Sequence, residues 1–223
     1  MLQDVEKNIS PTLAGEVANA LLDVQAVQFS PEQPFRWSSG WQSPIYCDSR
    51  LTISYPAIRR QITEGFGQLI RSYFPQAEVV VGVATAGIPQ AALLAQSFEL
   101  PMLYVRAKPK DHGRENQIEG RIVPGQSAVI VEDIISTGKS ALQAAEVLRE
   151  AGVEVLGVIA ILTYGFDFAH QQFEAQGLPF YTLTDYTRLL VEVFKREDVS
   201  EKTMASLHEW RKNPQQWQPL PQS

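Results

Sequence analysis

Short apolar runs rich in β-branched residues alternate with helical stretches through the middle of the chain. The runs are EVVVGV (78–83), MLYVR (102–106), SAVIVED (127–133) and EVLGVIAILTY (154–164). Runs without polar alternation are typical of strands that are buried on both faces. Helical stretches between such strands predict right-handed crossovers. We therefore expect an α/β fold whose core, at about 78–185, is a doubly wound, mainly parallel sheet.

The regions on either side of this core follow other patterns. Apolar residues near helical spacing predict a first helix at about 12–27 and a second at about 56–73. Between them, residues 29–50 contain three prolines, two tryptophans and a Ser-Ser-Gly turn signal, which predict extended or hairpin structure. Residues 185–223 predict one or two surface helices that end in a Pro- and Gln-rich strip, to which we assign no chemistry.

Composition and charge exclude several classes of protein. The 223 residues are 44% hydrophobic and 20% charged, which favours a single globular domain over 1–223. The net charge of −6 disfavours binding to nucleic acid or anionic lipid. No apolar run approaches the roughly 18 residues of a membrane span, and no signal peptide is evident. Because the single cysteine, Cys47, also suits a reducing compartment, we expect a cytoplasmic protein.

One basic segment stands out in this acidic chain. Arg106, Lys108, Lys110 and Arg114 face only one acid, Asp111, so four minus one gives a local charge of +3 before His112 is counted. Such a segment can hold a polyanionic ligand that the rest of the surface repels.

The strongest chemical signal is VIVEDIISTGKSAL, at 129–142. It predicts a buried strand that ends in Glu132 and Asp133, followed by small and hydroxyl residues that open a helix. Free backbone N–H groups at a helix N-terminus form a phosphate site, and Gly138 permits close approach. The TGKS tetrapeptide is not a nucleotide-triphosphatase loop, because that motif requires glycine where this chain has Asp133.

Two acids directly before a phosphate loop suit a sugar phosphate. Their carboxylates can accept hydrogen bonds from ribose hydroxyls and favour positive charge on the ribose in a transition state. The alternative is that Glu132 and Asp133 only cap the following helix.

Residues 129–140 resemble the phosphoribosyl diphosphate (PRPP) signature of type I phosphoribosyltransferases. The resemblance implies a pentosyltransferase that binds PRPP through the nine residues Glu132, Asp133, Ile134, Ile135, Ser136, Thr137, Gly138, Lys139 and Ser140. Asp133 is also implied to be catalytic.

A second segment, YVRAKPKDHGRENQIEG (104–120), resembles the mobile catalytic loop of orotate phosphoribosyltransferases. Arg106, Lys110 and His112 take the places of that loop's Arg, Lys and His, which implies that they bind PRPP and act in catalysis. The family's loop acts across a dimer interface, so a homodimer is implied here. A loop of this kind can neutralise a leaving diphosphate and exclude water.

Two further segments extend the resemblance over most of residues 20–190. SSGWQSPIYCD (38–48) is similar to the family's base-side hood, so about 1–60 would form an N-terminal helix and hood, and about 186–223 a helical tail. ATAGIP (84–89) is similar to the loop beside the diphosphate. Ser136 and Tyr46 are the implied contacts to orotate.

The chain departs from enteric members of the family at three places. Those members have lysines where this chain has Ser38 and Ala86, and an arginine near Tyr164. The orotate carboxylate is thereby left without an obvious cation, for which Arg50 and Arg59 are candidates. The branch typical of Gram-positive bacteria, with small residues at those places, looks closer.

The implied reaction joins orotate to PRPP, giving orotidine 5′-monophosphate and diphosphate in pyrimidine (UMP) biosynthesis. Mg²⁺ would be held mainly by substrate and water, with no direct side-chain ligand. The alternatives are a phosphoribosyltransferase for another base and a non-catalytic PRPP-sensing regulator. Four residues are expected to have no catalytic role: Cys47, packed in the hood, the isolated His170 and His208, and Trp37, a core residue.

Overall fold

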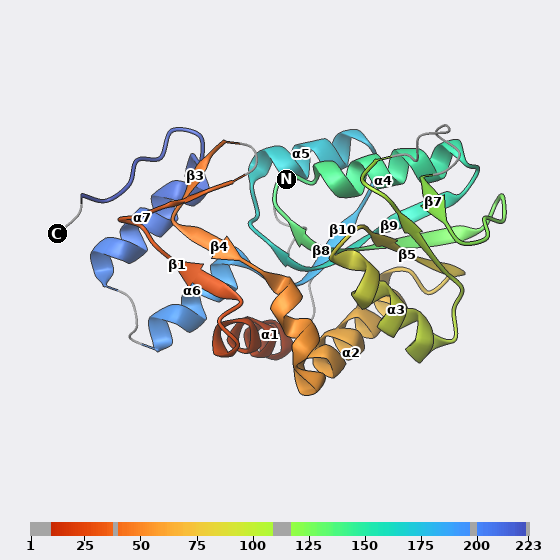
Figure 1. Ribbon diagram of the computed structural model, residues 1–223, viewed down its shortest axis with the longest axis horizontal. Helices are drawn as coiled ribbons and strands as arrows, with labels where there is room; N and C mark the ends of the chain where they lie inside the picture. The colour runs from red at the N-terminus through yellow and green to blue at the C-terminus, as the bar shows by residue number, and fades with distance from the viewer. Residues whose placement is uncertain (1–9, 38–39, 109–116, 197–199, 222–223) are drawn as a thin grey trace.

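The computed structural model describes residues 10–37, 40–108, 117–196 and 200–221. A central sheet lies between two layers of helices, and a smaller part that contains short strands stands beside it (Figure 1). The elements in chain order are α1 (Pro11–Asp23), β1 (Val27–Phe29), β2 (Phe35–Arg36), β3 (Gln42–Ser43), β4 (Ile45–Cys47), the 3₁₀ helix η1 (Ser49–Ser54), α2 (Pro56–Tyr73), β5 (Val79–Val83), α3 (Gly87–Phe98), β6 (Met102–Val105), β7 (Ile118–Glu119), β8 (Ser127–Ile135), α4 (Lys139–Glu150), β9 (Glu154–Thr163), α5 (Asp167–Ala175), β10 (Phe180–Asp185), α6 (Tyr186–Lys195) and α7 (Glu201–Lys212).

The six-stranded sheet has the order β10-β9-β8-β5-β6-β7. All neighbouring pairs are parallel except β6 and β7, so the mainly parallel sheet is confirmed. After β5 the chain moves outward to β6, and it then returns to β8 on the other side of β5. The order of the strands reverses between β5 and β8, and a ligand crevice forms at such a point, outside the carboxyl ends of the strands.

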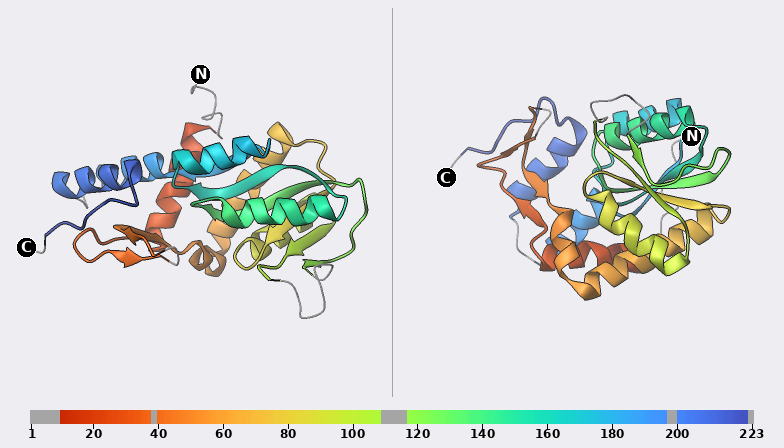
Figure 2. Two further views of the ribbon diagram at one scale, coloured as in Figure 1. Left: turned by 90° about the horizontal axis from the view of Figure 1, so that it is seen from above. Right: turned by 45° about the vertical axis from the view of Figure 1, so that its right-hand side comes forward.

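Both faces of the sheet are covered, which explains its uninterrupted apolar runs. Every residue of β5 is buried. One core cluster joins the sheet to α1, α2 and α3, and the other joins it to α4 and α5. Figure 2 shows these two helical layers on opposite sides of the strands.

The residues from β1 to β4 form the part that we call the hood (27–47). β1 pairs with β4 and β2 with β3, both antiparallel, which confirms the expected hairpin structure. The C-terminal residues cover the hood: the indole of Trp210 on α7 donates to the carbonyl of Gln42 at 3.1 Å, and the amide of Leu220 donates to the carbonyl of Pro31 at 2.9 Å. Segments from both ends of the described chain therefore build this part together (Figure 2).

Three expectations about the elements were wrong in detail. The first helix ends at Asp23, not near Val27, because the chain turns through Gln25 at a φ of 55° into β1. The strand that carries the acid pair continues to Ile135, since Ile134 and Ile135 pair with β9. The tail is not a surface feature, because the side chains of Tyr186 and Trp210 are almost completely buried.

Among the described residues, no helix combines the length and the apolar character needed to span a membrane.

Candidate active site

The end of β8, the following loop and the start of α4 form the first part of the site. Ser136 and Thr137 are partly exposed, and α4 begins at Lys139 with Gly138 as its N-cap. Gly138 has a φ of 79°, and a Cβ there would lie 2.5 Å from the ring of Phe173. The loop is therefore compact and presents helix N–H groups to solvent, as a phosphate site requires.

A second loop lies at the same edge of the sheet. It leaves β5 after Val83, contains a cis peptide between Ala84 and Thr85, and enters α3 at Gly87. A Cβ on Gly87 would lie 2.3 Å from the carbonyl oxygen of Val131, so only glycine permits the start of α3 to approach β8 this closely. The loop that resembles the diphosphate loop is thus placed directly beside the acid pair.

The two acids differ in their surroundings. Glu132 is 6% exposed, and its Oε1 accepts a hydrogen bond from the amide of Asp133 at 3.1 Å. Burial, and secondly the charge of Asp133, raise the pKa of Glu132 well above its usual value. Asp133 is more accessible, and its Oδ2 accepts a hydrogen bond from the hydroxyl of Ser49 at 2.5 Å.

Ser49 belongs to a buried polar chain that connects three elements. Thr52, on the same 3₁₀ helix, donates to the carbonyl of Ser49 at 2.6 Å. The side-chain amide of Gln90, on α3, donates to the Thr52 hydroxyl at 3.5 Å. Ser49, Thr52 and Gln90 are each no more than 2% exposed. The carboxylate of Asp133 is therefore supported from η1 and, through it, from the helix that follows the diphosphate-side loop.

The hood places Tyr46 and Cys47 near the acid pair. The Cys47 thiol has a pKa raised first by burial and then by the charges of Asp133 and Asp48. A protonated, buried thiol is a poor nucleophile, which agrees with the expected packing role. Tyr46 is 38% exposed and lies 5.5 Å from the ring of Phe35, centroid to centroid.

Tyr164 directly follows β9 and packs in a cluster of aromatic rings that includes the hood residue Trp37. Burial is the largest cause that raises the pKa of Tyr164, and the charges of Cys47, Tyr186 and Asp133 raise it further. Its ring lies 5.0 Å from that of Trp37 and 5.6 Å from that of Trp210. The position near which enteric relatives have an arginine is therefore part of an aromatic cluster, and Trp37 packs in it as expected.

Of the segment at 104–120, the structure describes residues 104–108 and 117–120. Arg106 is half-buried, and its Nη1 lies 3.3 Å from Oε1 of Glu119 on β7. Its backbone pairs with Gln117, whose side-chain amide also donates to the Arg106 carbonyl at 2.8 Å. Lys110 and His112 lie outside the described residues, as does Ser38.

The structure thus brings together the PRPP motif and the 84–87 loop, while Tyr46 lies in the hood next to Cys47. Lys139 and Ser140 are exposed at the start of α4, while Ile134 and Ile135 belong to the strand. His170 stacks on Phe180, with the ring centroids 4.9 Å apart. In the described ranges, no group of three or more His, Cys, Asp or Glu side chains is arranged to hold a metal ion.

Sequence reasoning missed the three residues that support Asp133. Ser49 directly follows the hood motif, which was a usable signal. Thr52 and Gln90 gave none, because isolated polar residues on helices resemble ordinary surface positions until their burial is known.

Comparison with known proteins agrees with this geometry. Residues 52–176 match the phosphoribosyl transferase domain family. The fold and the site accordingly define a type I phosphoribosyltransferase.

Full-length relatives narrow the family. The chain is 52% identical over 202 residues to the orotate phosphoribosyltransferase of Cytophaga hutchinsonii, which covers 91% of this chain and 97% of that protein. It is 55% identical over 203 residues to that of Halalkalibacterium halodurans, with coverage of 90% and 97%. The crystal structure of orotate phosphoribosyltransferase from Aeropyrum pernix superposes with a TM-score of 0.72 at 28% identity, covering 80% of this chain and 98% of that chain. This chain belongs to the orotate phosphoribosyltransferase family.

Proposed function

We propose that this protein transfers the phosphoribosyl group of PRPP to orotate, giving orotidine 5′-monophosphate and diphosphate for UMP synthesis. The observation that carries the proposal is the acid pair Glu132–Asp133, which lies between two helix-opening loops at the point where the strand order reverses. Membership of the orotate phosphoribosyltransferase family supports orotate as the base.

The 5′-phosphate binds at the loop that begins with Ser136 and ends at the first turn of α4. Backbone N–H groups there, the hydroxyls of Thr137 and Ser140, and Lys139 supply the donors. Glu132 and Asp133 accept hydrogen bonds from the ribose hydroxyls. Their negative charge stabilises the oxocarbenium character that develops as the bond from C1 to diphosphate breaks.

The leaving diphosphate is met by Arg106, Lys110 and His112. The position of Arg106 at the start of the basic segment, where its backbone pairs with Gln117, supports this role. Arg and Lys stabilise the increased charge on the leaving oxygen, and His112 can do so when protonated.

Mg²⁺, when bound, supplies positive charge that neutralises the diphosphate and orients it against the ribose. Glu132 and Asp133 are oxygen donors, which Mg²⁺ prefers, and an ion held mainly by PRPP oxygens and water would lie beside them.

Orotate lies between Ser136 and the hood residue Tyr46. Its ring nitrogen, once deprotonated, is the nucleophile that attacks C1 of the ribose. A covalent enzyme intermediate is not needed, which agrees with the buried, protonated thiol of Cys47.

The proposal includes a cytoplasmic homodimer in which the segment at 104–120 acts across the interface. The resemblance of this segment to the family's shared loop supports the dimer. The free, buried Cys47 is compatible with a reducing compartment.

The test measures the loss of orotate absorbance when the purified protein is mixed with PRPP and Mg²⁺. Uracil, adenine and a mixture without Mg²⁺ are the controls. Mg²⁺-dependent loss of orotate alone supports the proposal. Turnover of another base instead, or PRPP binding in calorimetry without any turnover, would replace it by the other-base enzyme or by the regulator.

A further inference from the structure

Orotate differs from uracil by a carboxylate next to the reacting nitrogen. A carboxylate that enters a partly desolvated pocket needs a cation or several hydrogen-bond donors. The end of β9 supplies aromatic rings, because Tyr164 packs against Trp37 and Trp210. The partner of the substrate carboxylate must therefore come from another element.

Arg50 lies at the edge of the site, on η1. It directly follows Ser49, whose hydroxyl is bonded to Asp133. Its side chain is 59% exposed, so a ligand can reach it. Arg50 thus lies three residues after the end of the hood and one residue after the contact to Asp133. Its pKa is raised first by the hydrogen bond to Asp48 and further by the charges of Asp48, Tyr46 and Asp133.

The guanidinium is already oriented before any substrate binds. Its Nε donates to Oδ1 of Asp48 at 2.6 Å, and its Nη2 donates to Oδ2 at 2.8 Å. This two-point contact uses one edge of the planar group and leaves Nη1 for a ligand. An arginine held in this way loses less conformational freedom when it binds an anion.

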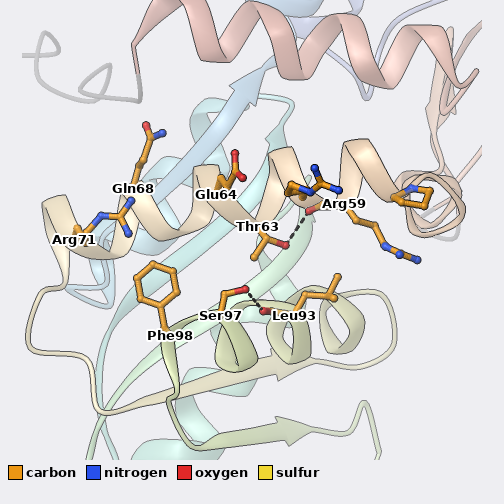
Figure 3. A pocket seen from close by; sticks show the side chains of 10 residues that line it. Arg59, Thr63, Glu64, Gln68, Arg71, Leu93, Ser97 and Phe98 are labelled. Atoms are coloured by element: carbon orange, nitrogen blue, oxygen red, sulfur yellow. Dashed lines mark hydrogen bonds between the residues drawn. The ribbon is translucent and has the colours of Figure 1, made fainter.

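Arg59, the second candidate from the sequence, serves a different surface. It lines a groove between α2 and α3 together with Arg71 and Phe98 (Figure 3). Its Nη1 donates to the carbonyl of Ile53 at 2.8 Å. None of the residues that line this groove belongs to the proposed substrate site.

Two other arginines near these elements are also engaged elsewhere. Arg211 donates to the hydroxyl of Thr187 at 2.7 Å, and its charge acts on His170 and Tyr186. Arg106 is placed at β6 and β7, on the diphosphate side. Of these four arginines, Arg50 is the one that directly follows the residue bonded to Asp133, close to the end of the hood.

We propose that Arg50 is the specificity residue that recognises the carboxylate of orotate. The proposal rests on the function proposed above and goes further, since it assigns the base-reading cation. Asp48 is then the residue that positions Arg50, and Nη1 is the donor that meets the substrate. The arginine would compensate for the basic side chains that the resemblance leads one to expect at Ser38 and near Tyr164.

The test compares Arg50→Gln with the matched control Arg59→Gln. Loss of a charged hydrogen bond predicts that KM for orotate rises about 10- to 100-fold in Arg50→Gln, whereas KM for PRPP stays within about 3-fold of wild type. Arg59→Gln should leave both constants unchanged. Arg50→Lys should recover part of the orotate affinity, because it keeps the charge but loses the planar fork.

A pair of inhibitors separates recognition of charge from a general loss of fit. Inhibition by an orotate analogue with a carboxylate at C6 is compared with inhibition by its neutral carboxamide counterpart. The wild-type preference for the charged analogue should disappear in Arg50→Gln and persist in Arg59→Gln. PRPP binding measured by calorimetry verifies that each variant is folded.

An unchanged preference in a folded Arg50→Gln protein overturns the assignment of Arg50, and so does equal loss of both analogues. Each result is distinct from failure of the proposed function, which would appear as a wild-type protein that does not consume orotate at all.

Discussion

The hydroxyl of Ser49 donates a hydrogen bond to Oδ2 of Asp133 at 2.5 Å, joining two residues that lie 84 positions apart in the sequence. Ser49 is 2% exposed and is held in turn by Thr52, which donates to its carbonyl. A carboxylate with one oxygen fixed in this way has a defined orientation, and under the proposed function it would be presented to the ribose in that orientation. The 3₁₀ helix η1, which directly follows the hood, therefore orients the carboxylate of Asp133 in the PRPP motif.

Replacing Ser49 by Ala should lower kcat/KM for PRPP about 10-fold, because hydrogen bonds to charged groups contribute about 1.5–3 kcal/mol. Steady-state kinetics with varied PRPP measures the change. Ser54→Ala, on the exposed end of the same 3₁₀ helix, is the matched control and should be neutral. Normal kinetics in Ser49→Ala would show that Asp133 does not depend on this contact.

Glu132→Gln should stabilise the substrate-free protein at alkaline pH. The pKa of Glu132 is raised in the folded state, chiefly by burial and then by Asp133. A carboxyl with a raised folded-state pKa contributes its full stability below the unfolded value of 4.5, and this contribution is lost as pH rises through the folded pKa. Glutamine keeps an acceptor for the Asp133 amide and carries no charge.

Urea unfolding at pH 8 and pH 5 measures this effect. The advantage of Glu132→Gln over wild type should be larger at pH 8 and should shrink toward pH 5. PRPP affinity should fall, since the ribose loses a charged acceptor. An advantage that did not change with pH would mean that Glu132 does not titrate as burial predicts.

Gly138→Ala should weaken PRPP binding and destabilise the protein. Gly177→Ala is its matched control, because both glycines have a positive φ, of 79° and 58°, but a Cβ at Gly177 meets nothing within 4 Å. In the control, the free energy of unfolding should fall only by the cost of the left-handed backbone conformation, about 1–2 kcal/mol. Gly138→Ala adds the clash with Phe173, 2.5 Å away, at the phosphate loop.

Calorimetry with PRPP and thermal unfolding measure the two effects separately. PRPP affinity should fall in Gly138→Ala and stay at the wild-type value in Gly177→Ala. Equal PRPP affinity in the two variants would remove the phosphate-loop assignment.

Lys110→Ala should lower kcat strongly, by about 100-fold or more, while the Kd for PRPP changes little. The reason is that its contact to the leaving diphosphate strengthens in the transition state. Single-turnover kinetics and PRPP titration separate the two quantities. Lys108→Ala, two positions earlier in the same basic segment, is the control and should retain most of the activity. Wild-type turnover in Lys110→Ala would refute the role assigned to this segment.

The sequence predicted the central sheet well because its strands are buried on both faces. Short uninterrupted runs of β-branched residues such as Val79–Val83 favour a buried strand over a buried helix, and the acid pair and Gly138 mark the carboxyl end of one strand. The nearness of the loops at 84–87 and 136–138 followed from the topology alone, since neighbouring parallel strands end at the same edge.

Contacts between distant segments were beyond the sequence pattern. Nothing local in residues 201–212 shows that Trp210 packs on Trp37, so the tail resembled a surface helix. The choice between Arg50 and Arg59 was open for the same reason. Only the structure distinguishes Arg50, which pairs with Asp48 next to the Ser49–Asp133 contact, from Arg59, which lies in the groove between α2 and α3 (Figure 3).

The cover of the hood by α7 also determines the order in which the protein can be completed during synthesis. The carbonyl of Gln42 cannot accept its hydrogen bond until the indole of Trp210 is translated, 168 residues later. The acid pair, the phosphate loop and every strand of the main sheet leave the ribosome before that residue. A nascent chain therefore acquires the acid pair and the loop at 136–138 before it can close the hood, and Trp37 stays without its Trp210 contact in the interval.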